Sequence, residues 1–365
     1  MSNTIGEKVR LTIFGESHGP YVGAVLDGLE PGIHVDENFI NECLAKRRPN
    51  MVTDTARVEK DKYQIISGVF NGYTTGAPLC ILIPNENVRS EDYNPDIPRP
   101  SHADYVTRMD SKGYNDYRGG GHTSGRVTAP IVAMGAIALQ RLESKGIKLG
   151  THILRCGYVV DSEFHQIEEE FHIIDKKEIP VIDNIEEEIE KVIRDAKEKK
   201  DSIGGILQTA VIGLPLGVGD PWFESLEGVI ANAMFSIGGI KGIEFGAGFH
   251  FADGLGSSMN DELAYVDSRV VTLSNNNGGI NGGLSNGMPI IFNLAVKPTP
   301  SIAQPQRSIN LRTGENVTFE IKGRHDPAII RRIVPVVNAL LAIVLLDEIT
   351  KKFGEEYFKQ WWNTA

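Results

Sequence analysis

A glycine-rich segment at 116–129 concentrates the residue types that could bind an anionic ligand. Three consecutive glycines, at 119–121, let a backbone approach a ligand without steric cost. The segment also carries hydroxyl and basic side chains: Arg118, His122, Thr123, Ser124, Arg126 and Thr128. Because basic groups beside the start of a helix attract anions, we expect a phosphate or carboxylate site here. A turn whose hydroxyls only cap the following helix is the alternative.

The surroundings of these glycines do not fit a nucleotide motif. A dinucleotide fingerprint needs an apolar strand before its glycines, but residues 111–117 are polar and aromatic. No Walker-type loop of glycines and lysine occurs in the sequence either. The segment therefore predicts anion binding without a classical nucleotide-binding unit.

A second segment, 15–19, formally matches the G-x-S-x-G nucleophile elbow, with Ser17 as the nucleophile. That motif needs a strand before the serine and a helix after it. Here Pro20, Gly23 and Gly28 interrupt an alternating apolar pattern, which is typical of a hairpin. A Ser17-centred esterase is kept as a rival hypothesis.

Basic residues also occur in two other places. The long polar connection at 84–117 contains Arg99 and His102, and loops of this length in compact domains are usually functional or disordered. Arg47 and Arg48 end a helix predicted to begin after Asp36. A solvated histidine, and arginines that only complement the helix dipole, are the alternatives.

Charge and composition restrict the class of protein. The 365 residues have a net charge of −11, of which −8 lies in 161–201 with its 15 acidic and 7 basic residues. The rest of the chain is nearly balanced, so no basic face suited to nucleic acid is expected. The acidic segment should form a charged surface helix at 185–200, to which we assign no chemistry.

Features of cellular context favour the cytoplasm. Cys43, Cys80 and Cys156 stand singly in apolar surroundings without metal-ligand spacing, which predicts free thiols and no metal site. The N-terminus lacks a signal-peptide pattern. The longest apolar run, 333–346, is too short to span a bilayer and should be a buried helix rather than a membrane anchor.

Hydrophobic periodicity predicts strands and helices that recur along the chain without a clear linker, so we treat 1–365 as one domain. Helices are expected at 36–48, 130–146, 185–200, 220–237 and about 327–353. Strands are expected at 9–14, 21–26, 63–70, 79–83, 150–160, 206–216, 242–251, 288–296 and 317–321. The 220–237 helix is predicted from Asp220 as its cap and Pro221 as its first residue.

Five short motifs together resemble the signature set of the chorismate synthase family. They are the segments 15–19, 99–104, 118–121, 297–299 and 323–327, with the sequences GESHG, RPSHAD, RGGG, KPT and GRHDP. Each is weak alone, but they occur in the family's order between about residues 3 and 347. The chain is therefore identified as similar to this family.

The resemblance implies an α+β fold, namely a β-α-β sandwich with central helices flanked by antiparallel sheets, and a homotetramer. It implies elimination of phosphate from 5-enolpyruvylshikimate 3-phosphate to give chorismate, with reduced FMN as cofactor and no net redox change. An external flavin reductase would supply the electrons. Because no nicotinamide fingerprint is present, we predict no intrinsic reduction of flavin by NADPH. A protein that only binds flavin or an anion is a further alternative.

Roles for individual residues follow from the resemblance, position by position. His18 would protonate the departing phosphate with Ser17 beside it, His102 would act at the reduced flavin, and Asp326 matches an aspartate near flavin N5. Four arginines would contact substrate or flavin: Arg48, Arg99, Arg126 and Arg324. Flavin binding would fall to His122, Thr123, Ser124, Gly238, Gly239, Gly282, Lys297, Pro298, Thr299, Pro300, Ser301 and Arg324.

The sequence departs from the common family pattern in places. The segment 121–128 lacks an arginine and a glutamate that many members have near the flavin. A second family arginine after Arg48 is also missing, and Arg57 is the nearest replacement. Gly238 and Gly239 replace a common Asn-Ala pair.

Overall fold

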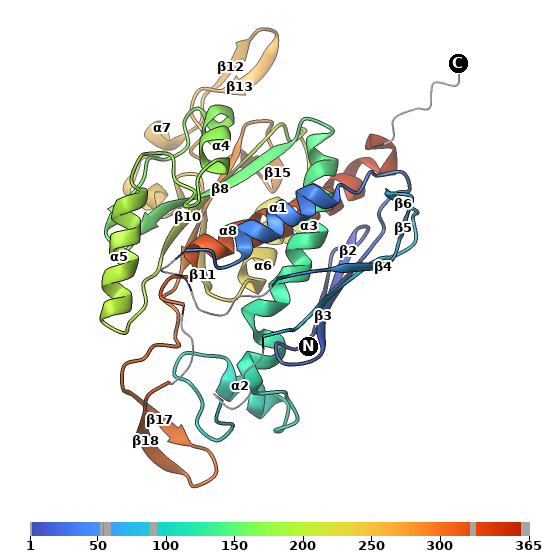
Figure 1. Cartoon of the computed structure of the whole chain (residues 1–365). Coiled ribbons are helices and arrows are strands. Elements are labelled where there is room, and N and C mark those ends of the chain that lie inside the picture. The colour runs from blue at the N-terminus through green and yellow to red at the C-terminus, as the bar shows by residue number, and fades with distance from the viewer. Residues whose placement is uncertain (1, 52–53, 55–59, 88–92, 322–325, 359–365) are drawn as a thin grey trace.

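The computed structural model describes residues 2–51, 54, 60–87, 93–321 and 326–358. Its core is a layer of helices between two five-stranded antiparallel sheets (Figure 1). This is the β-α-β sandwich expected from the sequence. Buried apolar side chains of both sheets and of the helices between them belong to one cluster.

The first sheet is built from the N-terminal part of the chain. Its strands, in spatial order, are β1 (Thr4–Ile5), β2 (Arg10–Gly15), β3 (Tyr21–Asp27), β7 (Leu79–Pro84) and β4 (Gln64–Ser67). The predicted hairpin is confirmed, because β2 and β3 pair with Phe14 opposite Gly23. A Cβ on Gly23 would lie 2.4 Å from Cζ of Phe14, so the small residue lets the Phe14 ring cross the strand.

The second sheet is built from the C-terminal part. Its strands, in spatial order, are β11 (Ile240–Phe245), β16 (Ile290–Val296), β10 (Gly205–Ile212), β8 (Lys148–Cys156) and β9 (Val159–Val160). Buried and less buried residues alternate along β16, as expected for a strand with one face on the core. The strand predicted at 150–160 is thus two strands, separated by a turn at Gly157, whose φ is +58°.

Four helices form the central layer: α1 (Glu37–Arg47), α3 (Thr128–Glu143), α6 (Leu226–Ser236) and α8 (Ile330–Phe353). Asp36 caps α1 as predicted, since its carboxylate accepts hydrogen bonds from the backbone N–H groups of Asn38 and Phe39. Helices α3 and α8 cross closely at Gly135. A Cβ added to this glycine would lie only 2.3 Å from Cβ of Ala339. Helix α8 is long and apolar enough to cross a membrane, but 94% of its apolar window is buried inside the protein. It is the buried helix that the sequence predicted.

The start of α6 corrects the sequence prediction. Asp220 and Pro221 do not begin the helix; they precede the short 3₁₀ turn η4 (Trp222–Glu224), in which Trp222 has a φ of +69°. The helix begins after Ser225, whose hydroxyl accepts a hydrogen bond from Gly228 N. Leu226 N donates to Gly283 O, a contact between distant segments that local capping signals do not reveal.

Smaller elements cover the rims and outer faces. The remaining helices are α2 (Asp104–Asp110), α4 (Ile167–Asp175), α5 (Glu186–Glu198) and α7 (Gly256–Met259), with 3₁₀ turns η2 (Arg118–Thr123), η3 (Gly125–Val127), η5 (Gly248–Asp253) and η6 (Glu355–Tyr357). Two-stranded hairpins join β5 (Val69–Phe70) to β6 (Tyr73–Thr74), β12 (Leu263–Val266) to β13 (Arg269–Thr272), β14 (Ile280–Asn281) to β15 (Leu284–Ser285) and β17 (Gln306–Asn310) to β18 (Glu315–Phe319).

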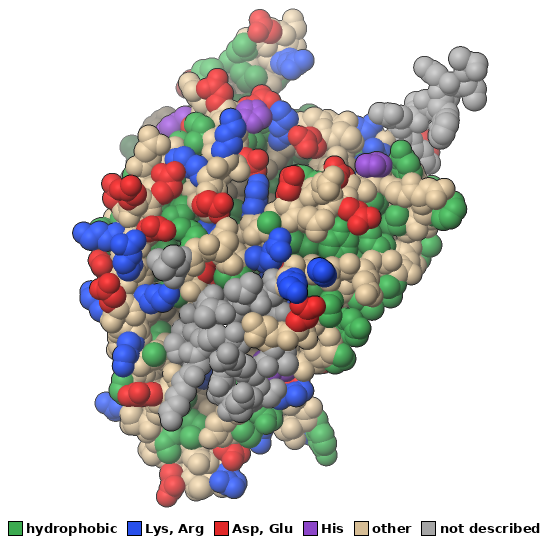
Figure 2. Space-filling view, in the orientation of Figure 1, with side chains coloured by type: hydrophobic (Ala, Val, Ile, Leu, Met, Phe, Trp, Pro, Cys, Tyr) green, Lys and Arg blue, Asp and Glu red, His purple; other side chains and the backbone are tan. Residues whose placement is uncertain are grey.

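The acidic segment forms two helices, α4 and α5, on the side of the second sheet. Helix α4 contacts β8 and β10, and α5 buries Ile189, Val192 and Ile193 as expected. On the face seen in Figure 2, acidic and basic side chains are interspersed.

Candidate active site

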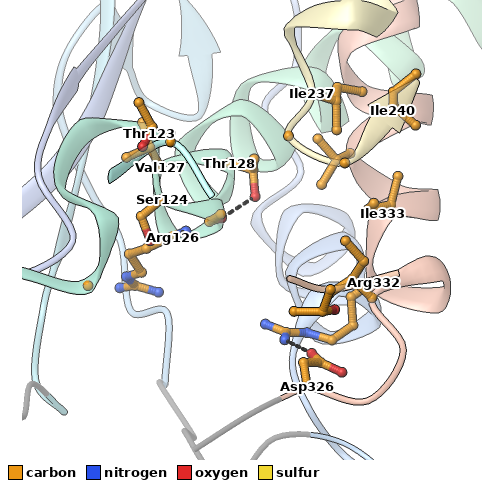
Figure 3. A pocket seen from close by; sticks show the side chains of 18 of the residues that line it. Thr123, Ser124, Arg126, Val127, Thr128, Ile237, Ile240, Asp326, Arg332 and Ile333 are labelled. Carbon is orange, nitrogen blue, oxygen red and sulfur yellow. Dashed lines mark hydrogen bonds and ion pairs between the residues drawn. The ribbon is translucent and has the colours of Figure 1, made fainter. Parts of the chain in front are cut away.

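One cavity of about 850 Å³ brings the sequence motifs together. Segments from both sheets and from α1, α3, α6 and α8 line it. Figure 3 shows Arg126 and Thr128 on one side and Asp326, Arg332 and Ile333 on the other. The sequence-predicted residues that line it are His18, Arg48, His102, His122, Thr123, Ser124, Arg126, Gly238, Gly239, Lys297, Thr299, Pro300, Ser301 and Asp326.

The glycine triplet allows two histidines to approach its backbone. Gly119 and Gly120 have φ values of +60° and +86°, which side-chain-bearing residues rarely adopt. A Cβ on Gly119 would lie 2.6 Å from His18 Nε2, and one on Gly120 would lie 3.2 Å from His102 Cε1. Glycine is therefore needed here for both conformation and space.

His18 and Ser17 occupy the turn between β2 and β3. Ser17 is fully buried and His18 is 8% exposed, with its ring edge-on to Tyr93 at 5.3 Å between centroids. Ser17 N donates to Gly121 O at 3.0 Å, so this turn is fixed to the glycine loop. Because a strand rather than a helix follows Ser17, the nucleophile-elbow interpretation is wrong.

The second histidine is held by Arg99 and Asp104. His102 Nδ1 lies 2.7 Å from Oδ1 of Asp104. Arg99 also binds Asp104, donating from Nε at 2.7 Å and from Nη2 at 2.8 Å, while its Nη1 donates to Ser301 Oγ at 3.1 Å. All three guanidinium nitrogens of Arg99 are thus occupied, and Arg99 does not line the cavity.

Arg126 lies in the cavity wall within a buried charge cluster. Its guanidinium is ion-paired with Asp61 and donates to Asn85 Oδ1 at 2.8 Å and to Pro84 O at 3.0 Å. Asp61 also lies 3.5 Å from Arg47 Nη1. Each guanidinium nitrogen of Arg126 donates to another group of the protein. In this arrangement Arg126 therefore stabilises the cavity wall.

Arg48 differs from Arg126 in how its guanidinium is used. Among the described residues it makes one hydrogen bond, from Nη1 to Lys60 O at 3.1 Å. The other nitrogens remain available for an anion. Arginine's planar fork suits carboxylates and phosphates.

Asp326 lies at the start of α8 and pairs with Arg332. Arg332 also donates from Nε to Arg47 O at 3.0 Å, which ties α8 to the end of α1. Burial raises the pKa of Asp326, and the charge of Arg332 opposes that shift. The carboxyl group of Asp326 therefore takes up a proton at a higher pH than the carboxyl group of an exposed aspartate does.

The 297–301 segment forms a further part of the wall. Lys297 Nζ donates to Ser101 O at 2.8 Å, and its backbone N donates to Gly239 O at 2.9 Å. Burial and the nearby Lys241 lower the pKa of Lys297. An anion bound between the two lysines would relieve this repulsion.

Several predicted residues lie elsewhere. Gly282 forms the turn between β14 and β15, and Pro298 lines a separate small opening beside Arg155. Neither lines the cavity, and Ser17 is fully buried and is not among the lining residues. Arg57 and Arg324 lie outside the described residues.

Sequence reasoning missed four charged residues of the cavity: Arg47, Asp61, Lys241 and Arg332. Arg47 was noted only as a helix-end charge, and Arg332 stands beside Arg331 at the start of α8, just before a long apolar run. Burying a charged side chain costs free energy unless another group pairs with it, and this requirement is the signal that could have indicated these residues. Within the described ranges, no group of His, Cys, Asp and Glu has the arrangement of a metal site.

Comparison with known proteins agrees with this geometry. A sequence model of the chorismate synthase family matches residues 9–350. The chain belongs to the chorismate synthase family. It is 44% identical to the chorismate synthase of Methanocaldococcus jannaschii, over 96% of this chain and 97% of that protein. It is 43% identical to the chorismate synthase of Pyrococcus abyssi, over 94% and 96% of the two chains. A crystal structure of a chorismate synthase superposes with a TM-score of 0.76 at 29% identity, covering 96% of this chain and 94% of that one.

Proposed function

We propose that this protein eliminates phosphate from 5-enolpyruvylshikimate 3-phosphate to form chorismate, with reduced FMN as cofactor and no net redox change. The observation that carries the proposal is that all five family motifs contribute to one cavity, through His18, His102, Gly119, Lys297 and Asp326. Motifs separated by up to about 300 residues have no reason to converge in a protein that only needs stable turns.

The cavity wall also fits a flavin. Part of the wall is an apolar surface made by Ile237, Ile240, Ile329 and Ile333. In Figure 3, Ile237, Ile240 and Ile333 lie across from Ser124 and Arg126. Lys241 and Lys297 supply positive charge beside it. Thr299 Oγ1 is buried without a hydrogen-bond partner among the described residues, which suits a site that a polar ligand completes.

The reaction defines what the side chains must do. The C3–O bond breaks and phosphate leaves, while a hydrogen leaves C6. Reduced FMN, when bound, supplies electron density and accepts that hydrogen. The protein must hold the anionic substrate, supply a proton to the leaving group and exclude water.

Within this proposal the described residues divide these tasks. His18 holds the proton for the departing phosphate, and Arg48 binds an anionic group of the substrate. His102 and Asp326 act on the flavin side, where Lys297, Thr299 and Ser301 hold the cofactor. Arg126, held by Asp61, fixes the shape of the wall between α3 and the first sheet. Arg57 and Arg324 stay predictions, because they lie outside the described residues.

We further propose a single-domain lyase that acts as a homotetramer in the cytoplasm and receives electrons from an external flavin reductase. The three cysteines are free, and burial raises the pKa of Cys43 to about 12 and that of Cys156 to about 11. Such thiols are unreactive, which suits a protein of a reducing compartment.

The direct test is anaerobic incubation of the protein with photoreduced FMN and 5-enolpyruvylshikimate 3-phosphate, with phosphate release as the readout. We expect release with reduced FMN and none with oxidised FMN. An esterase would instead hydrolyse nitrophenyl esters without flavin, and a simple binding protein would hold flavin without turnover. Release that is independent of flavin would contradict the proposal.

A further inference from the structure

Asp104 contacts the Nδ1 atom of the His102 imidazole. Oδ1 of Asp104 lies 2.7 Å from His102 Nδ1, and the Asp104 side chain is 19% exposed. The Cε1–Nε2 edge of the ring faces Gly120, where an added Cβ would lie 3.2 Å from Cε1 and 3.6 Å from Nε2 of His102. Nδ1 thus meets a carboxylate, whereas Nε2 lies on the edge of the ring that faces the glycine loop, and His102 lines the cavity.

The chemistry of these groups fixes the position of the proton. An ionised carboxylate only accepts hydrogen bonds, so a neutral His102 must carry its proton on Nδ1 to bond Asp104. Arg99 Nη2, 3.2 Å from Nδ1, is a donor and cannot replace that interaction once Nδ1 is protonated. The lone pair of the neutral ring is then on Nε2.

The carboxylate stays ionised over the ordinary pH range. Burial acts to raise the pKa of Asp104, but hydrogen bonds from Arg99 and His102 outweigh it and hold that pKa well below its usual range. The same carboxylate also accepts from Arg99 N at 3.1 Å, which fixes its position at the start of α2.

The loop that carries the pair is itself fixed by a distant segment. Arg99 Nη1 donates to Ser301 Oγ at 3.1 Å, and Lys297 Nζ donates to Ser101 O at 2.8 Å. Ser308 Oγ donates to Pro98 O at 2.5 Å. The histidine therefore stands on a constrained backbone, and its ring orientation depends on the carboxylate.

We propose that Asp104 is a positioning residue that fixes His102 as the Nδ1-protonated tautomer, with Nε2 directed toward the flavin side of the cavity. The proposal deepens the proposed function and rests on it for the part that concerns catalysis. Asp104 is not among the residues that line the cavity, so it would act through the imidazole.

The tautomer can be measured without any activity. Protein labelled with ¹⁵N-histidine gives distinct shifts for protonated and unprotonated ring nitrogens by solid-state NMR, and the His102→Ala variant identifies the His102 signals among the nine histidines. In the flavin-free wild type at a pH where the ring is neutral, we expect the Nδ1-protonated form. Asp104→Asn presents an amide that can also donate, so the tautomer should change or become mixed. Asp104→Glu keeps an acceptor-only group and should preserve it.

Asp96→Asn is the matched control. Asp96 lies on the same loop and pairs with Arg312 at 3.4 Å and Arg108 at 4.0 Å, without contacting His102. We expect this variant to keep both the tautomer and the activity. With pre-reduced FMN, Asp104→Asn should slow phosphate release about 10-fold to 100-fold, as loss of outer hydrogen-bond partners of functional histidines does at metal sites.

Three results would overturn the proposal: an Nε2-protonated His102 in the wild type, an unchanged tautomer in Asp104→Asn, or a changed tautomer with normal phosphate release. The wild-type spectrum alone shows whether His102 is protonated on Nε2, so this test holds even if the Asp104→Asn variant does not fold. Failure of the proposed function is distinguishable, since no phosphate release by the wild type would leave the tautomer result intact.

Discussion

His18 Nε2 lies only 2.6 Å from the position that a Cβ on Gly119 would occupy. The glycine loop and the β2–β3 turn therefore fit together only while residue 119 has no side chain. The turn is also held by the hydrogen bond from Ser17 N to Gly121 O. This relationship makes the glycine a steric requirement for the position of the proposed acid.

The first prediction tests that requirement with Gly119→Ala. An alanine at a φ of +60° costs about 1–2 kcal/mol of backbone strain, and its Cβ must displace the His18 ring. Gly113→Ala is the control, because its φ is +84° but nothing lies within 4 Å of the added Cβ. Both variants should melt at lower temperature, but only Gly119→Ala should lose phosphate release beyond its loss of folded protein. Equal activity in the two variants would show that His18 need not stand there.

The second prediction separates the work of the two histidines. His18→Ala should slow single-turnover phosphate release about 10²–10⁴-fold while reduced FMN still binds, because it removes the proton donor for the leaving group. His102→Ala should change the affinity for reduced FMN more than that for substrate. The exposed His172 on α4 provides the control variant. Variants that stay folded and release phosphate at the normal rate would contradict these assignments.

The third prediction contrasts two arginines of the cavity. Arg126→Ala leaves Asp61 without its closest partner in a buried site, and breaking such a pair costs about 3–5 kcal/mol of unfolding free energy. Arg48→Ala should instead leave stability nearly unchanged and weaken substrate binding by about 1.5–3 kcal/mol, because its guanidinium makes a single hydrogen bond to the described part of the chain. Denaturant unfolding and KM measurements on both variants check this. An Arg126→Ala protein of normal stability with a raised KM would show that Arg126 binds substrate directly.

The fourth prediction concerns acid. The pKa of Asp104 is lowered in the folded state from an ordinary value of 3.8, so its interactions stabilise the fold fully above that pH. This stabilisation is lost as pH falls below 3.8 toward the folded-state pKa. The difference in unfolding free energy between wild type and Asp104→Asn should be smaller near pH 3 than near pH 5. A difference that grows between pH 5 and pH 3 would have the wrong sign.

The sequence predicted the elements whose causes are local. Asp36 caps α1 because its side chain reaches backbone groups two and three residues away, and the β2–β3 hairpin follows from alternation on either side of a short turn. The start of α6 was mispredicted because Asp220 and Pro221 mimic a local start, whereas the true start is capped by Ser225 and held by Gly283 O, from a distant hairpin.

The candidate site shows the same limit. The motif residues His18, His102 and Lys297 were found from the family resemblance and do line one cavity. Asp61 was missed because its partners are 14 and 65 residues away and it matches no motif. Such buried charge clusters are visible only once tertiary structure brings the partners together.

The most direct test of the central claim is the ratio of phosphate released to flavin oxidised, measured anaerobically with pre-reduced FMN and excess 5-enolpyruvylshikimate 3-phosphate. An elimination without net redox change should release many equivalents of phosphate per FMN, with the flavin still reduced at the end and chorismate as product. Release of one phosphate per flavin oxidised, or equal release with oxidised FMN, would contradict the account.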